Sequence, residues 1–141
     1  MRERGEINIA IANYLENSFN DYNNLNRNDN KQVQCLDEIK HIIIGRWYYG
    51  LYLIAKYKLK KRYVSHIGYF SKKKKKIIHG IWECIDKKAK NNGITYNFEQ
   101  NGIYLFQLRN KYEYYGTNVT DTNFNMAKKI YEGMYNELQK L

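Results

Sequence analysis

Proline is absent from this chain of 141 residues, and only two cysteines occur, Cys35 and Cys84. Without proline, nothing interrupts the long stretches of helix-forming residues, and this favours an all-α protein. The two cysteines form neither a CxxC pair nor a Cys/His ligand spacing. These features argue against a disulfide scaffold and a structural zinc site, and they favour a reducing cytoplasm.

The sequence also lacks a stretch that is long and apolar enough to cross a bilayer. Its most apolar run, residues 42–55, is too short and contains Arg46. The first residues lead into an amphipathic segment rather than into the apolar core of a signal peptide. We therefore expect a soluble cytoplasmic protein with no membrane partner.

Signatures of cofactor and metal chemistry are missing as well. Neither GxGxxG nor GxxxxGK[ST] occurs, and the three histidines do not form HxxxH or HExxH. We therefore expect no metal site and no cofactor. The sequence neither marks nor excludes a Ser/His/Asp or Cys/His pair.

One segment of the chain has many basic residues and no acidic ones, and its excess of basic residues equals the net charge of the whole chain. The net charge is +10, from 24 Lys and Arg against 14 Asp and Glu, and ten of the basic residues lie between Lys56 and Lys76 with no acid among them. Such a segment favours an anionic partner, most simply RNA, although a solvated charge run is the alternative. The candidate nucleic-acid-binding residues are Arg46, Lys60, Lys61, Arg62, Lys72, Lys73, Lys74, Lys75 and Lys76, with Tyr63 and Tyr69 available for stacking.

Hydrophobic periodicity predicts five helices, over residues 6–22, 31–62, 71–90, 97–115 and 120–141. In the first helix, the predicted stripe consists of Ile7, Ile11, Tyr14, Leu15, Ser18, Phe19 and Tyr22. Ser71 is the expected N-cap of the third helix, whose first turns then hold five lysines that oppose the helix dipole. Short loops between the helices predict an antiparallel bundle in one domain, residues 1–141.

Two segments place polar groups where core residues are expected. "GRWYYG", residues 45–50, has an arginine within an apolar helix, and its glycines could allow a neighbouring helix to approach closely. A buried arginine needs a partner, so Arg46 either points to solvent or meets an acid such as Glu113. "QLRNKYEYYG", residues 107–116, places Arg109 and Glu113 among three tyrosines.

The order of these motifs resembles the HEPN superfamily of small helical-bundle proteins. It runs from R-x-YY-G in the second helix, through His79-Gly80, to LR-x-K-x-E-Y at the end of the fourth, and covers about residues 31–141. The sequence departs from the closest branch at Gly50, where that branch has Ala, and at Glu113, where it has Asp. The resemblance implies a homodimer, a cleft lined by the fourth helices, and a prokaryotic defence, toxin–antitoxin or CRISPR-associated setting.

Active HEPN nucleases cut RNA without metal through an R-x(4–6)-H motif, and this chain departs from it. Arg109 matches the arginine, but the positions where the histidine should lie hold Tyr114, Tyr115 and Gly116. Arg62 with His66 has one residue too few between them. A tyrosine is a poor general base at neutral pH, because its pKa is near 10.

Three functions follow from this pattern. The first is a HEPN-like protein that binds RNA or a nucleoprotein partner, without the usual catalytic histidine. The second is a metal-independent endoribonuclease with a variant site, whose candidate residues are Arg109, Glu113, Tyr114 and His79. The third is a structural subunit that docks onto an acidic protein, such as an antitoxin or an effector complex. A buried polar network that merely fixes the dimer is the alternative role for Arg109, Glu113 and Tyr114.

Overall fold

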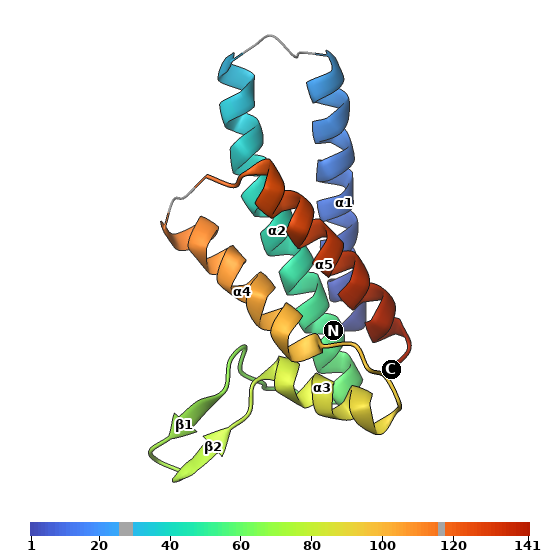
Figure 1. The fold of residues 1–141 in the computed structure, drawn as a ribbon, viewed down its shortest axis with the longest axis vertical. Coiled ribbons are helices and arrows are strands. Elements are labelled where there is room, and N and C mark those ends of the chain that lie inside the picture. The colour runs from blue at the N-terminus through green and yellow to red at the C-terminus, as the bar shows by residue number, and fades with distance from the viewer. Residues whose placement is uncertain (26–29, 116–117) are drawn as a thin grey trace.

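The computed structural model describes residues 1–25, 30–115 and 118–141, and the side chains of residues 1–21, 39–113 and 118–141. Helices dominate this part of the chain, which confirms the predicted all-α bundle (Figure 1). A small two-stranded sheet is added to it. The elements are α1 (Arg2–Leu25), α2 (Asn30–Leu59), β1 (Tyr69–Ser71), β2 (Lys76–Ile78), α3 (Ile81–Asn91), α4 (Phe98–Tyr115) and α5 (Asp121–Gln139).

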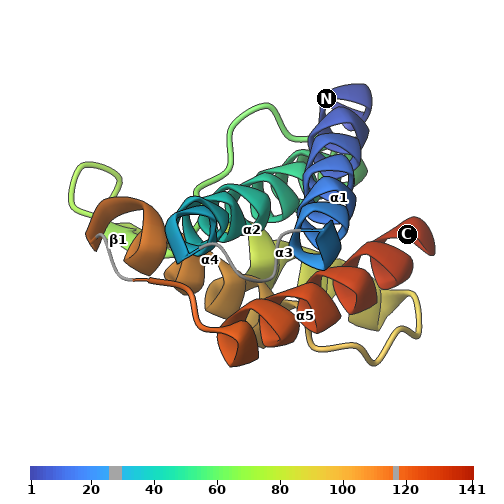
Figure 2. The ribbon, with the colours of Figure 1, turned by 90° about the horizontal axis from the view of Figure 1, so that it is seen from above.

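Helix α2 is the centre of the bundle and contacts all four other helices. Figure 2 shows α1, α4 and α5 arranged around it. Its apolar stripe faces the core, because Ile43, Trp47, Leu51 and Ile54 are fully buried. The Trp47 indole stacks on the ring of Tyr131 of α5 at 4.8 Å between centroids. Burial of this stripe joins the helices in one hydrophobic core.

The α1–α2 contact uses a face of α1 that overlaps only in part with the predicted stripe. Phe19 is buried and Leu15 packs against the core, as predicted, whereas Ile7, Ile11 and Tyr14 are exposed. Ile9 and Ala12 are buried in their place. The cause is a close helix crossing, at which a Cβ on either Gly5 or Gly50 would lie 2.8 Å from the carbonyl oxygen of the other. The predicted role of Gly50 in close packing is therefore confirmed. Gly45 does not share it, because a Cβ there would meet nothing within 4 Å.

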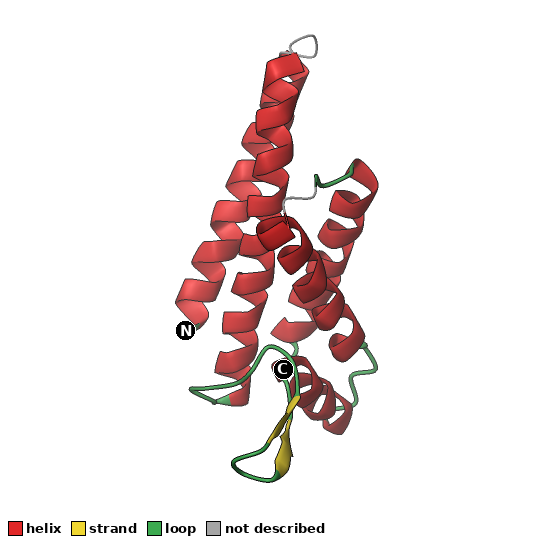
Figure 3. Cartoon of the chain, turned by 90° about the vertical axis from the view of Figure 1, so that its left-hand side faces the viewer, coloured by secondary structure: helices red, strands yellow, loops and turns green. Residues whose placement is uncertain are grey.

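The predicted helix over residues 71–90 is wrong in its first part, which forms a β-hairpin. Strands β1 and β2 pair antiparallel, with Tyr69 opposite Ile78 and Ser71 opposite Lys76. Ser71 does not cap a helix, and its Oγ accepts a hydrogen bond at 3.2 Å from the Lys74 backbone N–H within the turn. Five cations at a helix N-terminus would oppose the helix dipole, and in the hairpin they face solvent instead. The hairpin projects from the end of the bundle beside α3 (Figures 1 and 3).

Close backbone contact fixes the base of the hairpin to the bundle. A Cβ on Gly80 would lie 2.8 Å from the backbone nitrogen of Gly68, so the two legs could not meet with a larger residue at this position. The first residue of α3, Ile81, donates its backbone N–H to the carbonyl of Ser65 at 2.8 Å. The hairpin is thus anchored at its base while its turn extends away.

The last two helices confirm their predicted positions. Helix α4 packs on α3 where Gly102 faces the buried Trp82, so closely that a Cβ would lie 2.3 Å from the indole. Thr120 caps α5, since its Oγ1 accepts the Asn123 backbone N–H at 3.1 Å. Gly116, the expected end of the fourth helix, lies outside the described residues. No helix in the described part of the chain is long and apolar enough to cross a membrane.

Candidate functional site

The structure brings the two sequence motifs with unexpected arginines into one cavity. This cavity, here called the arginine pocket, has a volume of about 450 Å³ and lies between α1, α2 and α4. Arg46 comes from "GRWYYG" and Arg109 from "LRNKYE", so residues 63 positions apart meet at one place. The lining residues are Asn8, His41, Ile42, Gly45, Arg46, Tyr49, Arg109 and Glu113.

Arg109 and Glu113 form an ion pair along one face of α4. The Arg109 Nε donates to the Glu113 Oε2 at 2.7 Å, and Glu113 lies four positions after Arg109, about one helical turn. The guanidinium lies 5.7 Å from the centroid of the buried Tyr48 ring, and the Arg109 side chain is 20% exposed. Arg109 is therefore held on both sides while its remaining donors stay free to meet a ligand.

Arg46 is exposed to solvent, which is one of the two positions that the sequence suggested, and it does not pair with Glu113. Its Nη1 donates to the Oδ1 of Asn8 at 2.9 Å, and the Asn8 amide in turn donates to the carbonyl of Arg4 at 2.7 Å. Since Asn8 is neutral, the Arg46 charge has no carboxylate partner among the described residues. It lines the arginine pocket with Glu113 instead of joining the lysine-rich segment.

The charge of Arg109 acts on His66, which the sequence did not suggest as a partner of this arginine. The His66 Nδ1 lies 2.7 Å from the Tyr48 hydroxyl, whose oxygen accepts from the Trp82 Nε1 at 3.4 Å. Burial raises the pKa of Tyr48, so its hydroxyl stays protonated while it forms this hydrogen bond with His66. Burial first, and then the charges of Arg109 and Lys56, lower the pKa of His66. His66 is therefore held neutral at physiological pH.

His79 lies apart from Arg109 within one chain. Its Nδ1 pairs with the Glu83 Oε1 at 2.6 Å, and it lines a second cavity beside the hairpin. The side chain of Tyr114, the other candidate for proton transfer, lies outside the described residues. No group of three or more His, Cys, Asp or Glu that could hold a metal occurs among the described residues.

The second cavity, here called the hairpin pocket, has a volume of about 640 Å³. It lies between the end of α2, the segment that follows, and the β-hairpin. Its charged lining residues are Lys56, Lys61, Lys74 and Lys76, and its tyrosines are Tyr52, Tyr63 and Tyr69. Of the candidate nucleic-acid-binding residues, it thus brings together Lys61, Lys74 and Lys76.

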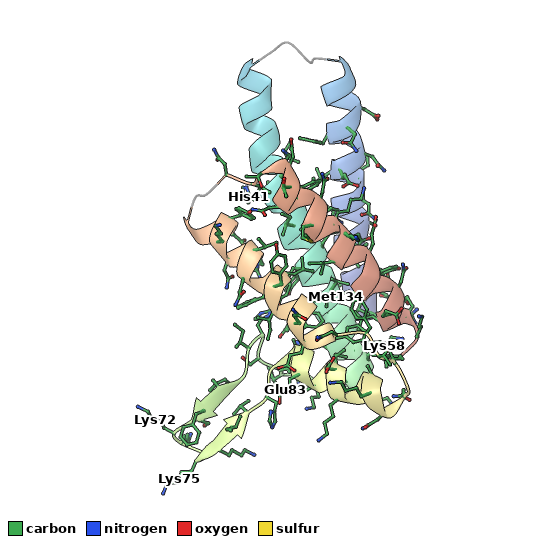
Figure 4. The ribbon with its side chains drawn as sticks, viewed as in Figure 1. His41, Lys58, Lys72, Lys75, Glu83 and Met134 are labelled. Carbon is green, nitrogen blue, oxygen red and sulfur yellow. The ribbon has the colours of Figure 1, made fainter. Side chains whose placement is uncertain are left out.

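The other candidate lysines lie around this pocket on the surface. Lys72, Lys73 and Lys75 are exposed in the hairpin turn, and Lys72 and Lys75 point away from the bundle (Figure 4). Lys60 and Arg62 are exposed just after α2, with the Arg62 guanidinium 5.6 Å from the Tyr63 ring centroid. Together, Lys60, Lys61, Arg62 and Lys72–Lys76 form what we call the lysine-rich surface.

Some of these positions could have been found from the sequence. His41, Gly45 and Tyr49 recur every four residues, which places a small residue and two polar ones on one face of an apolar helix. Asn8 and His66 carried no such signal, since their roles depend on contacts between distant segments.

No protein-family model, curated protein or solved structure matches this chain. The resemblance to the HEPN superfamily therefore stays a prediction.

The lowered pKa of His66 predicts a pH dependence of stability. A group whose pKa is lower in the folded than in the unfolded state contributes stability above its unfolded pKa, here about 6.5, and this contribution is lost as the pH falls. The free energy of unfolding should thus decrease from pH 7.5 to pH 5. Urea denaturation of His66→Gln should give a shallower decrease over the same range. Equal pH slopes in wild type and variant would contradict this role of His66.

Proposed function

We propose that this chain is a HEPN-like protein that binds RNA through the lysine-rich surface. The observation that carries the proposal is the placement of Lys72–Lys76 on a hairpin that projects from the bundle. None of the lysine-rich surface's cations pairs with a carboxylate among the described residues, although other lysines of the chain do, such as Lys90 with Asp86. Unpaired, projecting cations are suited to phosphate contacts, which supply most of the affinity for nucleic acid.

The backbone conformation at two lysines of the lysine-rich surface also supports a functional role for these residues. Lys60 and Lys75 have φ values of 54° and 50°, in the left-handed region that favours glycine or asparagine. A residue with a Cβ costs roughly 1–2 kcal/mol there. They are the non-glycine residues with positive φ in the described part of the chain. Stability alone would favour glycine at both sites, so the lysine charge serves another purpose.

The proposal predicts salt-sensitive RNA binding that depends on the hairpin turn. Combining Lys72→Gln with Lys75→Gly removes two charges and relieves the backbone at residue 75, so the fold should not weaken. For single-stranded RNA, the slope of log affinity against log salt should become shallower by about 1.4, since each phosphate contact contributes about 0.7. Fluorescence anisotropy between 50 and 300 mM salt measures this slope.

A matched control removes the same charge elsewhere, through Lys87→Gln with Lys129→Gln on exposed positions of α3 and α5. The control should bind RNA as the wild type does. Equal losses in both variants would indicate a general charge effect and would contradict a specific surface. Salt-insensitive RNA binding would contradict the proposal outright. Co-purification of an acidic protein after nuclease treatment, without RNA binding, would favour the third function, a subunit of a larger complex.

The proposal includes a homodimer, which exposed apolar side chains support. Ile7, Ile11 and Tyr14 are exposed on α1, and Ile42 and Tyr49 are exposed on α2, where they line the arginine pocket. Large apolar groups gathered on one face mark interaction sites more often than isolated ones do. Sedimentation equilibrium should give twice the chain mass, and Tyr14→Asp should shift it towards one chain mass. A wild-type monomer at micromolar concentration would remove the dimer from the proposal.

The arginine pocket favours a metal-independent ribonuclease as the second candidate. Arg46 and Arg109 could stabilise a phosphate together, and His41 or His66 could transfer a proton. His79 would have to come from a second chain to share this role, because its contacts within one chain lie at the hairpin pocket. Prokaryotic defence, toxin–antitoxin and CRISPR-associated systems are the settings that the HEPN resemblance suggests for either function.

Cleavage of end-labelled RNA in EDTA tests the second candidate. If the arginine pocket is catalytic, Arg109→Ala should abolish cleavage, and His41→Ala or His66→Ala should reduce it by 10²-fold or more, the usual size of an acid–base contribution. Arg62→Ala, on the lysine-rich surface, should instead weaken binding and leave the maximal rate unchanged. Absence of cleavage by the wild type, or cleavage that survives Arg109→Ala, would reject a nuclease built on this pocket.

A further inference from the structure

The hairpin pocket has the charge of an anion-binding site. Two of its lysines, Lys56 and Lys61, come from the end of α2 and the residues after it, and two, Lys74 and Lys76, come from the hairpin. No carboxylate lines the pocket, and none of the four lysines forms an ion pair with a described Asp or Glu. Like charges gathered around a cavity repel one another, and a bound anion relieves that repulsion.

The size of the hairpin pocket limits the ligand to a small molecule or to one unit of a polymer. Its volume of about 640 Å³ is in the range of pockets that hold ligands of nucleotide size. Its mouth is open to solvent, because Lys74, Lys76 and Tyr63 are all exposed. A single unit of an extended chain can therefore enter while the rest of that chain runs over the lysine-rich surface.

Two tyrosines of the pocket present exposed aromatic rings, and the Arg62 guanidinium lies near the ring of Tyr63. Tyr63 is 84% exposed and Tyr69 is 55% exposed, and neither belongs to the hydrophobic core. Tyr52 differs, since its hydroxyl donates to the Val64 carbonyl at 2.6 Å and its ring lies 4.1 Å from that of His66. Tyr52 therefore shapes the wall of the pocket, while Tyr63 and Tyr69 are available to stack on a planar ligand.

We propose that the hairpin pocket holds one nucleotide with an unpaired base. Its phosphate meets the four lysines, and its base stacks on Tyr63 or Tyr69. This inference rests on the proposed RNA binding and narrows it to single-stranded RNA, because a duplex keeps its bases stacked inside and cannot present one to a tyrosine. A free nucleotide carries the same chemistry, so the experiment includes one.

Fluorescence anisotropy with an unstructured 12-nucleotide RNA and with a duplex of the same sequence tests the pocket. Tyr63→Ala with Tyr69→Ala should weaken single-strand binding roughly 5- to 100-fold, since stacking contributes about 1–3 kcal/mol per base. Duplex binding should not change. Tyr63→Phe with Tyr69→Phe keeps both aromatic rings and should bind the single strand as the wild type does. Both tyrosines are exposed, so neither variant should unfold, and thermal melts check this.

The possible results distinguish failure of the nucleotide-pocket proposal from failure of the proposed RNA binding. Equal affinity of the wild type for single strand and duplex, or equal losses for both in the alanine variant, would overturn the pocket and leave RNA binding in place. A wild type that binds AMP, with loss in the alanine variant, but binds no RNA would overturn RNA binding and retain the nucleotide pocket. Absence of binding to RNA and AMP alike would overturn both.

Discussion

The buried side chain of Tyr48 connects the parts of the molecule on which both candidate sites depend. Its hydroxyl joins Trp82 of α3 to His66 of the segment before the hairpin. Its ring packs against Phe106 of α4 and lies under the Arg109 guanidinium. A fully buried phenol is stable only if its hydroxyl has partners, so these contacts must form together. The position of Arg109 and the path of residues 60–68 are thereby coupled to the same core.

The two pockets are therefore positioned by the same core, but their lining residues differ in chemistry. The arginine pocket is lined by three helices, and its two guanidinium groups are oriented by Asn8 and Glu113. The hairpin pocket has lysines on flexible stems and exposed aromatic rings. Arginines fixed in one geometry are suited to one phosphate position, whereas lysines act as adaptable point charges along a backbone. The hairpin is therefore the better site for initial binding of a long anion.

Periodicity predicted most of the fold, because the helices bury long apolar stripes. Periodicity did not predict the β-hairpin, because strands of three residues are too short to show an alternating hydrophobic pattern. Ser71 followed by lysines was interpreted as an N-cap, but local capping rules cannot show that Tyr69 and Ile78 pair across a turn. The predicted face of α1 was right for Leu15 and Phe19 but wrong for Ile7, Ile11 and Tyr14. The Gly5–Gly50 contact, which no single-helix pattern reveals, helps to decide which side of α1 faces α2.

Of the candidate site, only the features that lie within one segment of the chain could be predicted from the sequence. The spacing of Arg109 and Glu113 on one helix indicated their ion pair, and the lysine run indicated an anionic partner. The meeting of Arg46 with Arg109 depends on how α2 and α4 cross, and the place of His66 depends on a loop that folds back onto Tyr48. Such long-range contacts follow from tertiary packing, which one sequence without its fold does not specify.

The central claim is that RNA meets the lysine-rich surface first, and photo-crosslinking tests it most directly. Cleavage after glutamate gives residues 39–83, which contain the hairpin and Arg46, and residues 100–113, which contain Arg109, so sequencing within the first fragment distinguishes the two sites. With 4-thiouridine RNA, fragment sequencing should place the crosslinks at residues 60–79, above all at Tyr63 and Tyr69. Crosslinks confined to residues 41–49 and 100–113 would instead place the RNA in the arginine pocket and contradict the account.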